Sequence, residues 1–462
     1  MCEMLIIVDC RTSLSMSNSK EIKWVALQPL TGGMYLGFEN IIGCPAQCIV
    51  SYKGLNDYRP GKTGGRGRCG NEYNLMRYLY KKQRIVPRFE FQHGMFHLED
   101  NVEIKPDAMT EEIFGNTVSI FGNTVLPDFS DIDIVCAVPV CAGLSALTTT
   151  DDTQKELKNC NMKFLAEFAL KTIKPKAYIF ENAPGFMSIK GDRLRKWFEQ
   201  LAWETGYRIA YFKTDTRLHH NCQRRPRTFV IMLKEYGNTH HRCPDIDNIW
   251  EDKQMTLTDV LSSIPSDATY QDSLPAPLYE NETYIAWGKE VLGKDWREWF
   301  QGDVMNKIIK AGMLDAFEKW CEHTDKVDSK FSMRMIKHIN HIRECKAEGR
   351  GWWSASPRYY PVLAPAIQSR TVYAMIHPFK DSLCSERDAL TLMGMPYDFE
   401  MQGAFMSDGP KIGQNVPVKT AEWIARIALQ YIEKVDVGED ADDKHTSPRF
   451  YDNIKKKEVI YN

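Results

Sequence analysis

Short apolar runs alternate with amphipathic segments through the first half of the chain, and this alternation constrains the fold more than any other feature. The apolar runs have the length and the content of β-branched residues that buried strands show. Between them, apolar residues recur at helical intervals, as Leu194, Phe198 and Leu201 do. Strands that alternate with helices in this way predict a largely parallel sheet with helices on both faces. The expected strands lie within 23–33, 46–53, 131–140, 177–186, 207–214 and 227–235, and the expected helices within 34–43, 161–173 and 192–206.

The composition is typical of a globular protein with reduced thiols. Hydrophobic residues make up 43% and charged residues 26% of the 462 positions, which is enough chain for two or three domains. No apolar run is long enough to span a membrane, and the N-terminal residues lack the basic region of a signal peptide. The 13 cysteines follow no regular spacing, as in proteins of a reducing compartment. We therefore expect a cytoplasmic protein with no membrane partner.

The charge distribution restricts where a nucleic acid could bind. A net charge of −2 gives no general attraction for a polyanion, so such a partner needs a local basic face. Residues 326–350 contain seven Lys/Arg against three acids, and the apolar residues there fall on one face of a predicted helix. This helix is either an ordinary solvated element or a nucleic-acid contact. A glycine-rich basic stretch at 59–72 lacks the spacing of a phosphate-binding loop and is expected to be a surface loop.

The pattern changes along the chain and divides it into four parts. Residues 1–235 hold the alternating strands and helices. Residues 236–358 are rich in Trp and mostly helical, and residues 359–435 contain two further motifs described below. Residues 436–462 are charged with few apolar side chains, so we expect a loosely ordered tail.

One cysteine directly follows a predicted strand. The apolar run within 131–140 ends at Pro139, which has no N–H to donate to a sheet, and Cys141 comes two residues later. Open α/β sheets bind their ligands at the carboxyl ends of their strands. From this stretch alone, Cys141 is either a buried structural thiol or a nucleophile.

Two further segments bring polar groups to the same region. Glu181 and Asn182 follow the next predicted strand and would share an edge of the sheet with Cys141. Alternate polar residues then lead into a later strand, where their side chains are expected to share one face. These residues are Gln223, Arg225 and Arg227.

The order of these motifs resembles that of the DNA (cytosine-5) methyltransferase family. A cysteine, Glu-Asn and Gln-x-Arg-x-Arg are followed by SERDALTLMGMPYDF (385–399) and IGQNVPVKTAEWIARIAL (412–429). The resemblance covers 24–235 and 360–434. It implies a SAM-dependent methyltransferase domain of Rossmann-like α/β type, with cofactor-binding and catalytic residues in 1–235. A mainly helical target-recognition domain would occupy 236–358, and 359–435 would return to the catalytic domain.

The resemblance implies a covalent mechanism on a cytosine flipped out of double-stranded DNA. A thiolate that adds to carbon 6 makes carbon 5 nucleophilic enough to take a methyl group. Cys141 would be this nucleophile, and Glu181 would protonate or hydrogen-bond ring nitrogen 3. Asn182 would help to orient the base. Arg225 and Arg227 would stabilise the thiolate, the flipped base or its phosphates.

The resemblance also implies S-adenosyl-L-methionine as the cofactor, although the motifs that hold it depart from the family. The family's phenylalanine before the glycine turn is Gln28 here, and no acid ends the second strand. The proline and glutamine that flank the family's cysteine are Val140 and Ala142. A methyl group is expected, with another transferred group left open. The cofactor is expected at Thr31, Gly32, Gly33, Pro139, Gln414, Asn415 and Val416.

Two other functions stay open. Modification of cytosine in RNA would use the same chemistry, but the Cys-Phe-Thr tripeptide of the tRNA-modifying branch is absent. An inactive sequence-specific DNA-binding protein would fit the altered glycine motif, but it would have no use for Cys141 or Glu181. The motifs HHNC (219–222) and HHRC (240–243) lack zinc-finger spacing, so we expect no metal. We expect a monomer of bacterial or viral origin that acts beside a restriction enzyme or protects a viral genome.

Overall fold

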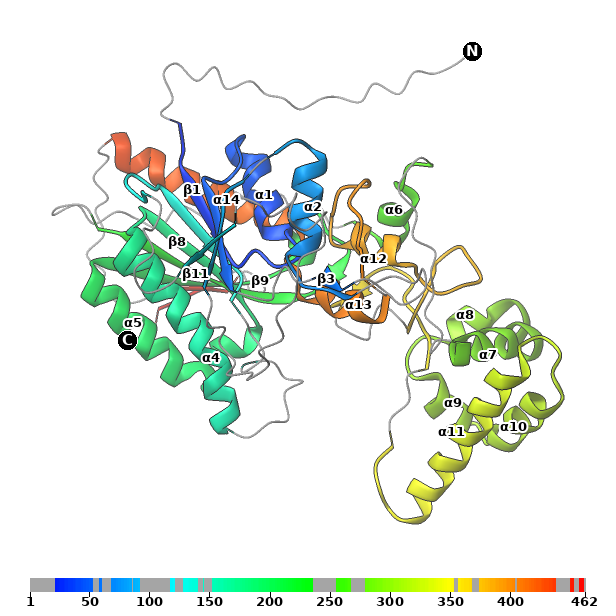
Figure 1. The fold of residues 1–462 in the computed structure, drawn as a ribbon. Helices are drawn as coiled ribbons and strands as arrows, with labels where there is room; N and C mark the ends of the chain where they lie inside the picture. The colour runs from blue at the N-terminus through cyan, green and yellow to red at the C-terminus, as the bar shows by residue number, and fades with distance from the viewer. Residues whose placement is uncertain are drawn as a thin grey trace.

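A computed structural model describes most of the chain (Figure 1). The described residues form one large sheet with helices on both faces and a further group of helices. They are 21–52, 58–59, 68–84, 86–91, 117–120, 128–139, 144, 152–235, 255–266, 279–352, 356–367, 374–403, 405–437, 449–452 and 457–460.

Ten strands form the main sheet, in the order β16-β15-β9-β11-β8-β7-β1-β2-β5-β6. Neighbouring strands run parallel from β8 to β6, whereas β11 runs antiparallel between β8 and β9. The prediction of a mostly parallel sheet is confirmed. The order along the chain reverses between β7 and β1, and open sheets bind ligands at such a point. The strands are β1 (Trp24–Leu27), β2 (Cys48–Tyr52), β5 (Arg88–Phe91), β6 (Thr117–Ile120), β7 (Ile134–Ala137), β8 (Ala177–Asn182), β9 (Tyr207–Asp215), β11 (Pro226–Lys234), β15 (Arg449–Asp452) and β16 (Lys457–Ile460).

The end of the chain differs from the expected loose tail at 436–462. Strand β15 pairs in parallel with β9 and antiparallel with β16. The two short segments contain aromatic and β-branched residues, which favour strands, and β9 offers them an unpaired edge. Residues 449–452 and 457–460 therefore extend the sheet.

The two faces of the sheet have separate cores because side chains alternate along each strand. Trp24 and Ala26 of β1 join one core with α1, α2 and α14, whereas Val25 and Leu27 join the other with α4 and α5. Figure 1 shows α1 and α14 on one side of the sheet and α4 and α5 on the other. These helices are α1 (Gly33–Ile42), α2 (Tyr73–Lys81), α4 (Asp152–Glu167), α5 (Asp192–Thr205) and α14 (Val418–Val437).

The first and last of these helices pack closely because α1 has glycines where they meet. A Cβ built on Gly37 would lie 2.4 Å from the Cβ of Ala421, and one on Gly33 would lie 1.9 Å from the carbonyl oxygen of Val416. Real Cβ atoms do not approach their neighbours so closely, so larger residues would push α14 away. The C-terminal segment therefore completes the same domain that residues 21–235 begin.

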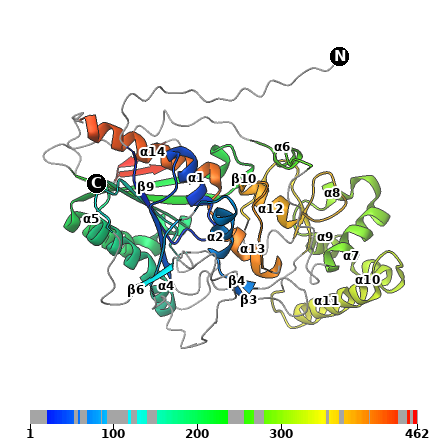
Figure 2. The ribbon, with the colours of Figure 1, turned by 45° about the horizontal axis from the view of Figure 1, so that its top comes forward.

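A second group of helices packs around its own core beside the sheet domain (Figures 1 and 2). Trp287, Phe317, Met335 and Ile339 are among the buried residues of this core. The basic segment at 326–350 forms its longest helix, α11. The elements of this group are α7 (Tyr279–Trp287), η8 (Gly288–Leu292), η9 (Gly293–Asp295), α8 (Trp296–Trp299), α9 (Val304–Lys310), α10 (Leu314–His323) and α11 (Ser329–Ala347).

Shorter elements complete the described part of the chain. In that part, no helix is both long and apolar enough to cross a membrane. The remaining α-helices are α6 (Leu257–Ser262), α12 (Glu386–Leu392) and α13 (Phe405–Gln414). The remaining π- and 3₁₀-helical elements are η2 (Phe168–Ile173), η3 (Pro184–Met187), η4 (Ile189–Gly191) and η5 (Thr216–Leu218). The paired short strands are β3 (Tyr58–Arg59) with β4 (Arg68–Cys69), β10 (Gln223–Arg224) with β13 (Ala364–Pro365), and β12 (Arg358–Tyr359) with β14 (Met375–Ile376).

Candidate active site

Three parallel strands bring several of the expected site residues to one edge of the sheet. Strands β1, β7 and β8 are parallel neighbours, so the segments that follow them leave the sheet at the same edge. Ala137 of β7 pairs with Phe180 of β8, and Pro139 and Asn182 each lie two residues further along. The turn at 31–33 follows β1 at this edge.

Cys141 lies outside the residues that the structure describes. Its nearest described neighbours along the chain are Pro139 and Leu144. Leu144 is buried in the core under α4 and α5, and a Cβ built on Gly185 would lie 2.1 Å from its carbonyl oxygen. Leu144, three residues after the cysteine, therefore touches the segment that follows Glu181.

Glu181 in β8 is buried and paired with Arg227. The Nε of Arg227 lies 2.6 Å from the Oε1 of Glu181. Arg227 reaches this carboxyl because β11 runs antiparallel beside β8, with Phe229 opposite Glu181. Burial raises the pKa of Glu181 and outweighs Arg227 and Arg225, which lower it. The carboxyl group therefore keeps its proton to higher pH than an exposed glutamate does, as a proton donor must.

Arg225 has different partners from those expected. Its side chain is buried, and its Nη1 donates to the carbonyl oxygen of Ile367 at 2.6 Å. Its Nη2 donates to the carbonyl oxygens of Gly413 and Asn415, each at 2.8 Å. Charge-assisted bonds to main-chain oxygens are strong, so Arg225 ties the C-terminal segment to the sheet domain.

Gln223 also links the C-terminal segments to the sheet domain, a role that its sequence motif did not indicate. Its Nε2 donates to the carbonyl oxygen of Leu392 at 2.6 Å, and its Oε1 accepts the N–H of Ile367 at 3.2 Å. The buried amide thus satisfies groups from two C-terminal segments.

The alternate residues 223, 225 and 227 do not share one set of partners. Strand β10 ends at Arg224 and β11 begins at Pro226, so no single strand contains all three. Arg225 binds main-chain oxygens, whereas Arg227 pairs with Glu181. The break between the strands, at Arg225 just before Pro226, separates the arginine that binds main-chain oxygens from the arginine that pairs with Glu181.

Asn182 fixes the turn after β8. It is fully buried, and its Oδ1 accepts the N–H of Ala183 at 2.9 Å. Its Nδ2 lies 3.5 Å from the sulfur of Met162 in α4. Its role in orienting a base stays a prediction.

Five of the seven residues expected at the cofactor lie together. The hydroxyl of Thr31 donates to the carbonyl oxygen of Lys411 at 3.0 Å, and the N–H of Gly33 donates to the Oδ1 of Asn415 at 2.8 Å. Gly32 has a φ of 105°, which favours glycine. The residues brought together are Thr31, Gly32, Gly33, Asn415 and Val416.

The other two expected cofactor residues lie to the side of this group. Pro139 follows β7, the neighbour of β1. The side chain of Gln414 is exposed, and its Oε1 accepts a hydrogen bond of 2.9 Å from the Nδ2 of Asn71.

Buried polar contacts lie at the carboxyl ends of β1 and β2, where the sequence departs from the family. Gln28 has a φ of 48°, and its Oε1 accepts a bond of 2.8 Å from the Nδ2 of Asn161 in α4. The hydroxyl of Ser51 donates to the Oε1 of Glu72 at 2.6 Å, while Arg88 lies 3.4 Å from the other carboxyl oxygen. The end of β2 has no acid of its own, but Glu72, just before α2, brings a carboxyl group to Ser51 in this strand. Burial raises the pKa of Glu72 to about 7.

The histidine motifs form no metal site in the described part of the chain. No group of three or more His, Cys, Asp or Glu side chains there could hold a metal ion. His219 of the HHNC motif is buried, with its Nε2 2.9 Å from the hydroxyl of Thr214, and Cys222 is a buried free thiol. The HHRC motif at 240–243 lies outside the described residues.

A family model described as C-5 cytosine-specific DNA methylase matches residues 106–429. The matched range includes Glu181, Arg225, Arg227 and the segment at 412–416. No curated protein matches the chain.

The chain is also similar to several solved structures. One is described as a DNA modification methyltransferase encoded within a prophage (E. coli), with 16% identity over 89% of this chain and 99% of that chain and a TM-score of 0.48. The Entamoeba histolytica methyltransferase EhMeth has 11% identity over 90% and 99% of the two chains and a TM-score of 0.44. The S. pombe Dnmt2 methyltransferase has 12% identity over 89% and 99% and a TM-score of 0.45.

Proposed function

The chain belongs to the C-5 cytosine-specific DNA methylase family, and on that premise we propose that it methylates carbon 5 of cytosine in double-stranded DNA. The observation that carries the proposal is Glu181, a buried acid with a raised pKa at the carboxyl end of β8. An acid of this kind keeps its proton to higher pH than an exposed glutamate does and can therefore protonate a ring nitrogen. Arg227 holds its carboxyl group in place at 2.6 Å.

Cys141 is the proposed nucleophile. Its thiolate adds to carbon 6 of the cytosine, so a C–S bond forms and ring electrons move to carbon 5 while Glu181 protonates nitrogen 3. After carbon 5 has taken the methyl group, its proton passes to a base and the C–S bond breaks. The last step restores the aromatic ring, the proton on Glu181 and the free thiolate.

The family takes its methyl group from S-adenosylmethionine, and the turn after β1 has a backbone that suits a bound ligand. Gln28, Leu30 and Gly32 have φ values of 48°, 53° and 105°. Non-glycine residues rarely adopt such angles, and strained backbone clusters where ligands bind. We expect this turn, Pro139 and the segment at 414–416 to hold the cofactor, which when bound supplies the methyl group for carbon 5.

The exposed face of α11 is the proposed contact with DNA phosphates. Lys330, Arg334, Lys337 and His341 are exposed and follow one another at intervals of four, three and four, which places them on one side of the helix. The opposite side packs into the helical core. Lysine and arginine side chains arranged in this way suit a phosphate backbone.

Arg343, on the same helix, differs from these residues. Its Nη2 lies 2.6 Å from carboxyl oxygens of both Asp315 and Glu318 in or beside α10. Because two acids already bind this guanidinium, we assign it to the packing of α10 against α11 and not to DNA.

The test is the capture of a covalent complex. A long duplex synthesised with 5-fluorocytosine in place of cytosine offers every recognition sequence, and the fluorine cannot leave as a cation. After methyl transfer the C–S bond should therefore persist, giving a denaturation-resistant complex that depends on S-adenosylmethionine. Mass spectrometry of nucleosides from ordinary DNA identifies the transferred group.

Cys141→Ala should abolish the complex, and Cys160→Ala is its matched control because Cys160 is an exposed cysteine outside any disulfide. A complex that survives Cys141→Ala but not Cys160→Ala would show that the nucleophile is assigned wrongly. A complex with a 5-fluorocytidine transcript but not with the duplex would favour an RNA substrate. Binding of DNA with no complex and no modified nucleoside would favour the inactive DNA-binding protein.

A further inference from the structure

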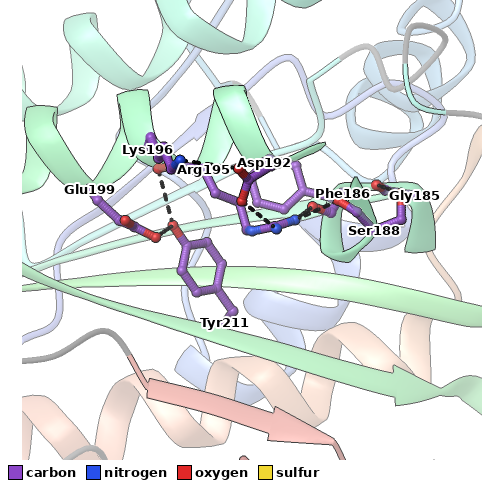
Figure 3. A network of polar contacts seen from close by, with 8 residues as sticks. All are labelled: Gly185, Phe186, Ser188, Asp192, Arg195, Lys196, Glu199 and Tyr211. Atoms are coloured by element: carbon purple, nitrogen blue, oxygen red, sulfur yellow. Dashed lines mark hydrogen bonds and ion pairs between the residues drawn. The ribbon is translucent and has the colours of Figure 1, made fainter. Parts of the chain in front are cut away.

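Arg195 of α5 holds the turn at 183–188, which follows the strand with Glu181 (Figure 3). Its Nη1 donates to the carbonyl oxygens of Phe186 and Ser188, the second at 2.9 Å. Its Nη2 donates to the Oδ1 of Asp192 at 3.1 Å. One guanidinium therefore restrains two main-chain groups of the turn.

Two further features keep the turn in place: the burial of the Phe186 ring and the absence of a side chain at Gly191. Phe186 is fully buried, with its ring centroid 5.8 Å from that of Phe198 and 5.9 Å from that of Tyr211. A Cβ built on Gly191 would lie 2.0 Å from the carbonyl oxygen of Phe186. A larger residue at 191 would displace the oxygen that Arg195 binds, so the local sequence is adapted to this contact.

Helix α5, which supplies Arg195, is itself fixed to the sheet. The hydroxyl of Tyr211 in β9 donates to the Oε1 of Glu199 at 3.1 Å and lies 3.4 Å from the carbonyl oxygen of Arg195 (Figure 3). The side chain of Arg195 is only 14% exposed. The guanidinium is therefore directed by its surroundings and does not sample solvent as a surface arginine does.

Gly185 connects the turn that Arg195 binds to Leu144. A Cβ on Gly185 would lie 2.1 Å from the carbonyl oxygen of Leu144, so any side chain there would displace Leu144. Leu144 comes three residues after Cys141, and Gly185 comes four residues after Glu181. The proposed nucleophile and the proposed acid thus belong to segments that meet at this glycine.

We propose that Arg195 is a positioning residue for methyl transfer. By holding the 183–188 turn, it fixes the place where Leu144, three residues after Cys141, packs against Gly185, four residues after Glu181. The inference rests on the proposed function; among the described residues, the hydrogen-bond partners of Arg195 are Phe186, Ser188 and Asp192, and Glu181 is not one of them. Misplacement of a reacting group by 1 Å can slow a reaction by about 100-fold, so a restraint of this kind matters for rate.

Arg195→Met tests the proposal, because methionine keeps an extended apolar side chain and has no donors. Lys196→Met is the matched control, since Lys196 is the next residue of the helix, pairs with the same Asp192 and is 74% exposed. At saturating DNA and cofactor, Arg195→Met should form the 5-fluorocytosine complex at least about tenfold more slowly than the wild type. Lys196→Met should keep the wild-type rate.

Further readouts separate positioning from a loss of folded protein. The dissociation constants for DNA and S-adenosylmethionine should stay near their wild-type values in Arg195→Met, because the proposal assigns Arg195 to the turn and to neither ligand. Arg195→Lys should recover part of the rate, since one ammonium can still reach one carbonyl oxygen. Gly185→Ala should slow the reaction similarly with Arg195 intact.

A second measurement does not need the reaction. Alkylation of Cys141 by iodoacetamide, relative to the exposed Cys160, is followed in each peptide by mass spectrometry. The ratio of the Cys141 alkylation rate to the Cys160 alkylation rate should rise in Arg195→Met and Gly185→Ala but not in Lys196→Met. If the wild type forms no complex, the proposed function fails and this ratio alone decides the role of Arg195. If the wild type reacts, an unchanged rate in Arg195→Met overturns the inference.

Discussion

The Nε of Arg227 lies 2.6 Å from the Oε1 of Glu181, yet the pKa of Glu181 stays above its ordinary value. Two opposing effects act on this carboxyl group: burial favours the neutral acid, and the guanidinium favours the carboxylate. Because burial is the larger effect, the group can hold a proton and still be fixed in position by a cation. This balance is what a general acid for a ring nitrogen requires.

Glu181→Gln should slow formation of the 5-fluorocytosine complex by about 100-fold or more, because an amide cannot give a proton to nitrogen 3. The affinity for DNA should change little, since the amide keeps the shape of the acid. Single-turnover kinetics and a binding titration measure the two quantities separately. A parallel loss of affinity and rate would indicate a role in holding DNA instead.

Arg227→Met should move the alkaline limb of the pH–rate profile to higher pH. Without this cation the pKa of Glu181 rises further, so the acid keeps its proton longer as pH increases. Arg208→Met is the control, because it breaks an ion pair with Glu235 away from the site. An acid limb that moves to higher pH, with the alkaline limb unchanged, would mean that the ionised form of Glu181 is the active one.

Arg225→Lys should destabilise the fold, because one ammonium cannot reproduce three bonds to separate carbonyl oxygens. Buried carbonyl groups left without donors should lower the free energy of unfolding by about 3 kcal/mol. Denaturant titration measures this change, and limited proteolysis should show earlier cleavage near residue 413. Arg224→Lys at the adjacent exposed position should behave as the wild type does.

Stability should depend on pH through Glu72. Burial raises its pKa from 4.5 to about 7, so the folded state binds more protons than the unfolded state between those values. The free energy of unfolding should therefore fall as pH rises through this window, by about 1.4 kcal/mol for each unit of pKa difference, and level off above it. Glu72→Gln should flatten the curve in a pH series of denaturant titrations. An unchanged slope would mean that Arg88 keeps the carboxyl group ionised.

Charge reversal at Arg334 and Lys337 should weaken binding to all DNA sequences and reduce the dependence of binding on salt. Each lost phosphate contact lowers the slope of log K against log salt by about 0.9 for duplex DNA. Arg343→Glu should instead lower the melting temperature, because Arg343 binds Asp315 and Glu318. A salt slope unchanged by the first two substitutions would move the contact to another surface, with the basic stretch at 62–68 as the next candidate.

The edge of the sheet could be predicted from the sequence because strand ends are visible in it. Apolar runs that stop at Pro139 or at Glu181 and Asn182 mark carboxyl ends, and parallel strands end at a common edge. The turn at 31–33 follows from the same reasoning. The direction of a strand is not visible in this way, since an apolar run has the same pattern whether it runs parallel or antiparallel to its neighbours. The antiparallel course of β11 was therefore not predicted.

The role of Arg225 could not be predicted, because its acceptors lie 142 to 190 residues away along the chain. A pattern of alternate residues shows which positions share a strand, but not which distant main chain approaches them. Pro226 was the available signal, because a proline often marks the point where a strand pairing begins or ends. The counterpart acid Glu72 was missed for a similar reason, since it reaches the end of β2 from another element.

The close packing of Gly33 and Gly37 against residues 416–421 has a consequence for how the molecule is made. The ribosome releases α1 long before it releases α14, and chains emerge at roughly 5–20 residues per second. The turn after β1 therefore has no partner while the residues between α1 and α14 are synthesised, and the face of α1 that packs against α14 stays uncovered during that time. The edge with Glu181 can assemble early, whereas the residues expected to hold the methyl donor come together only when residues 415–416 and α14 have been made.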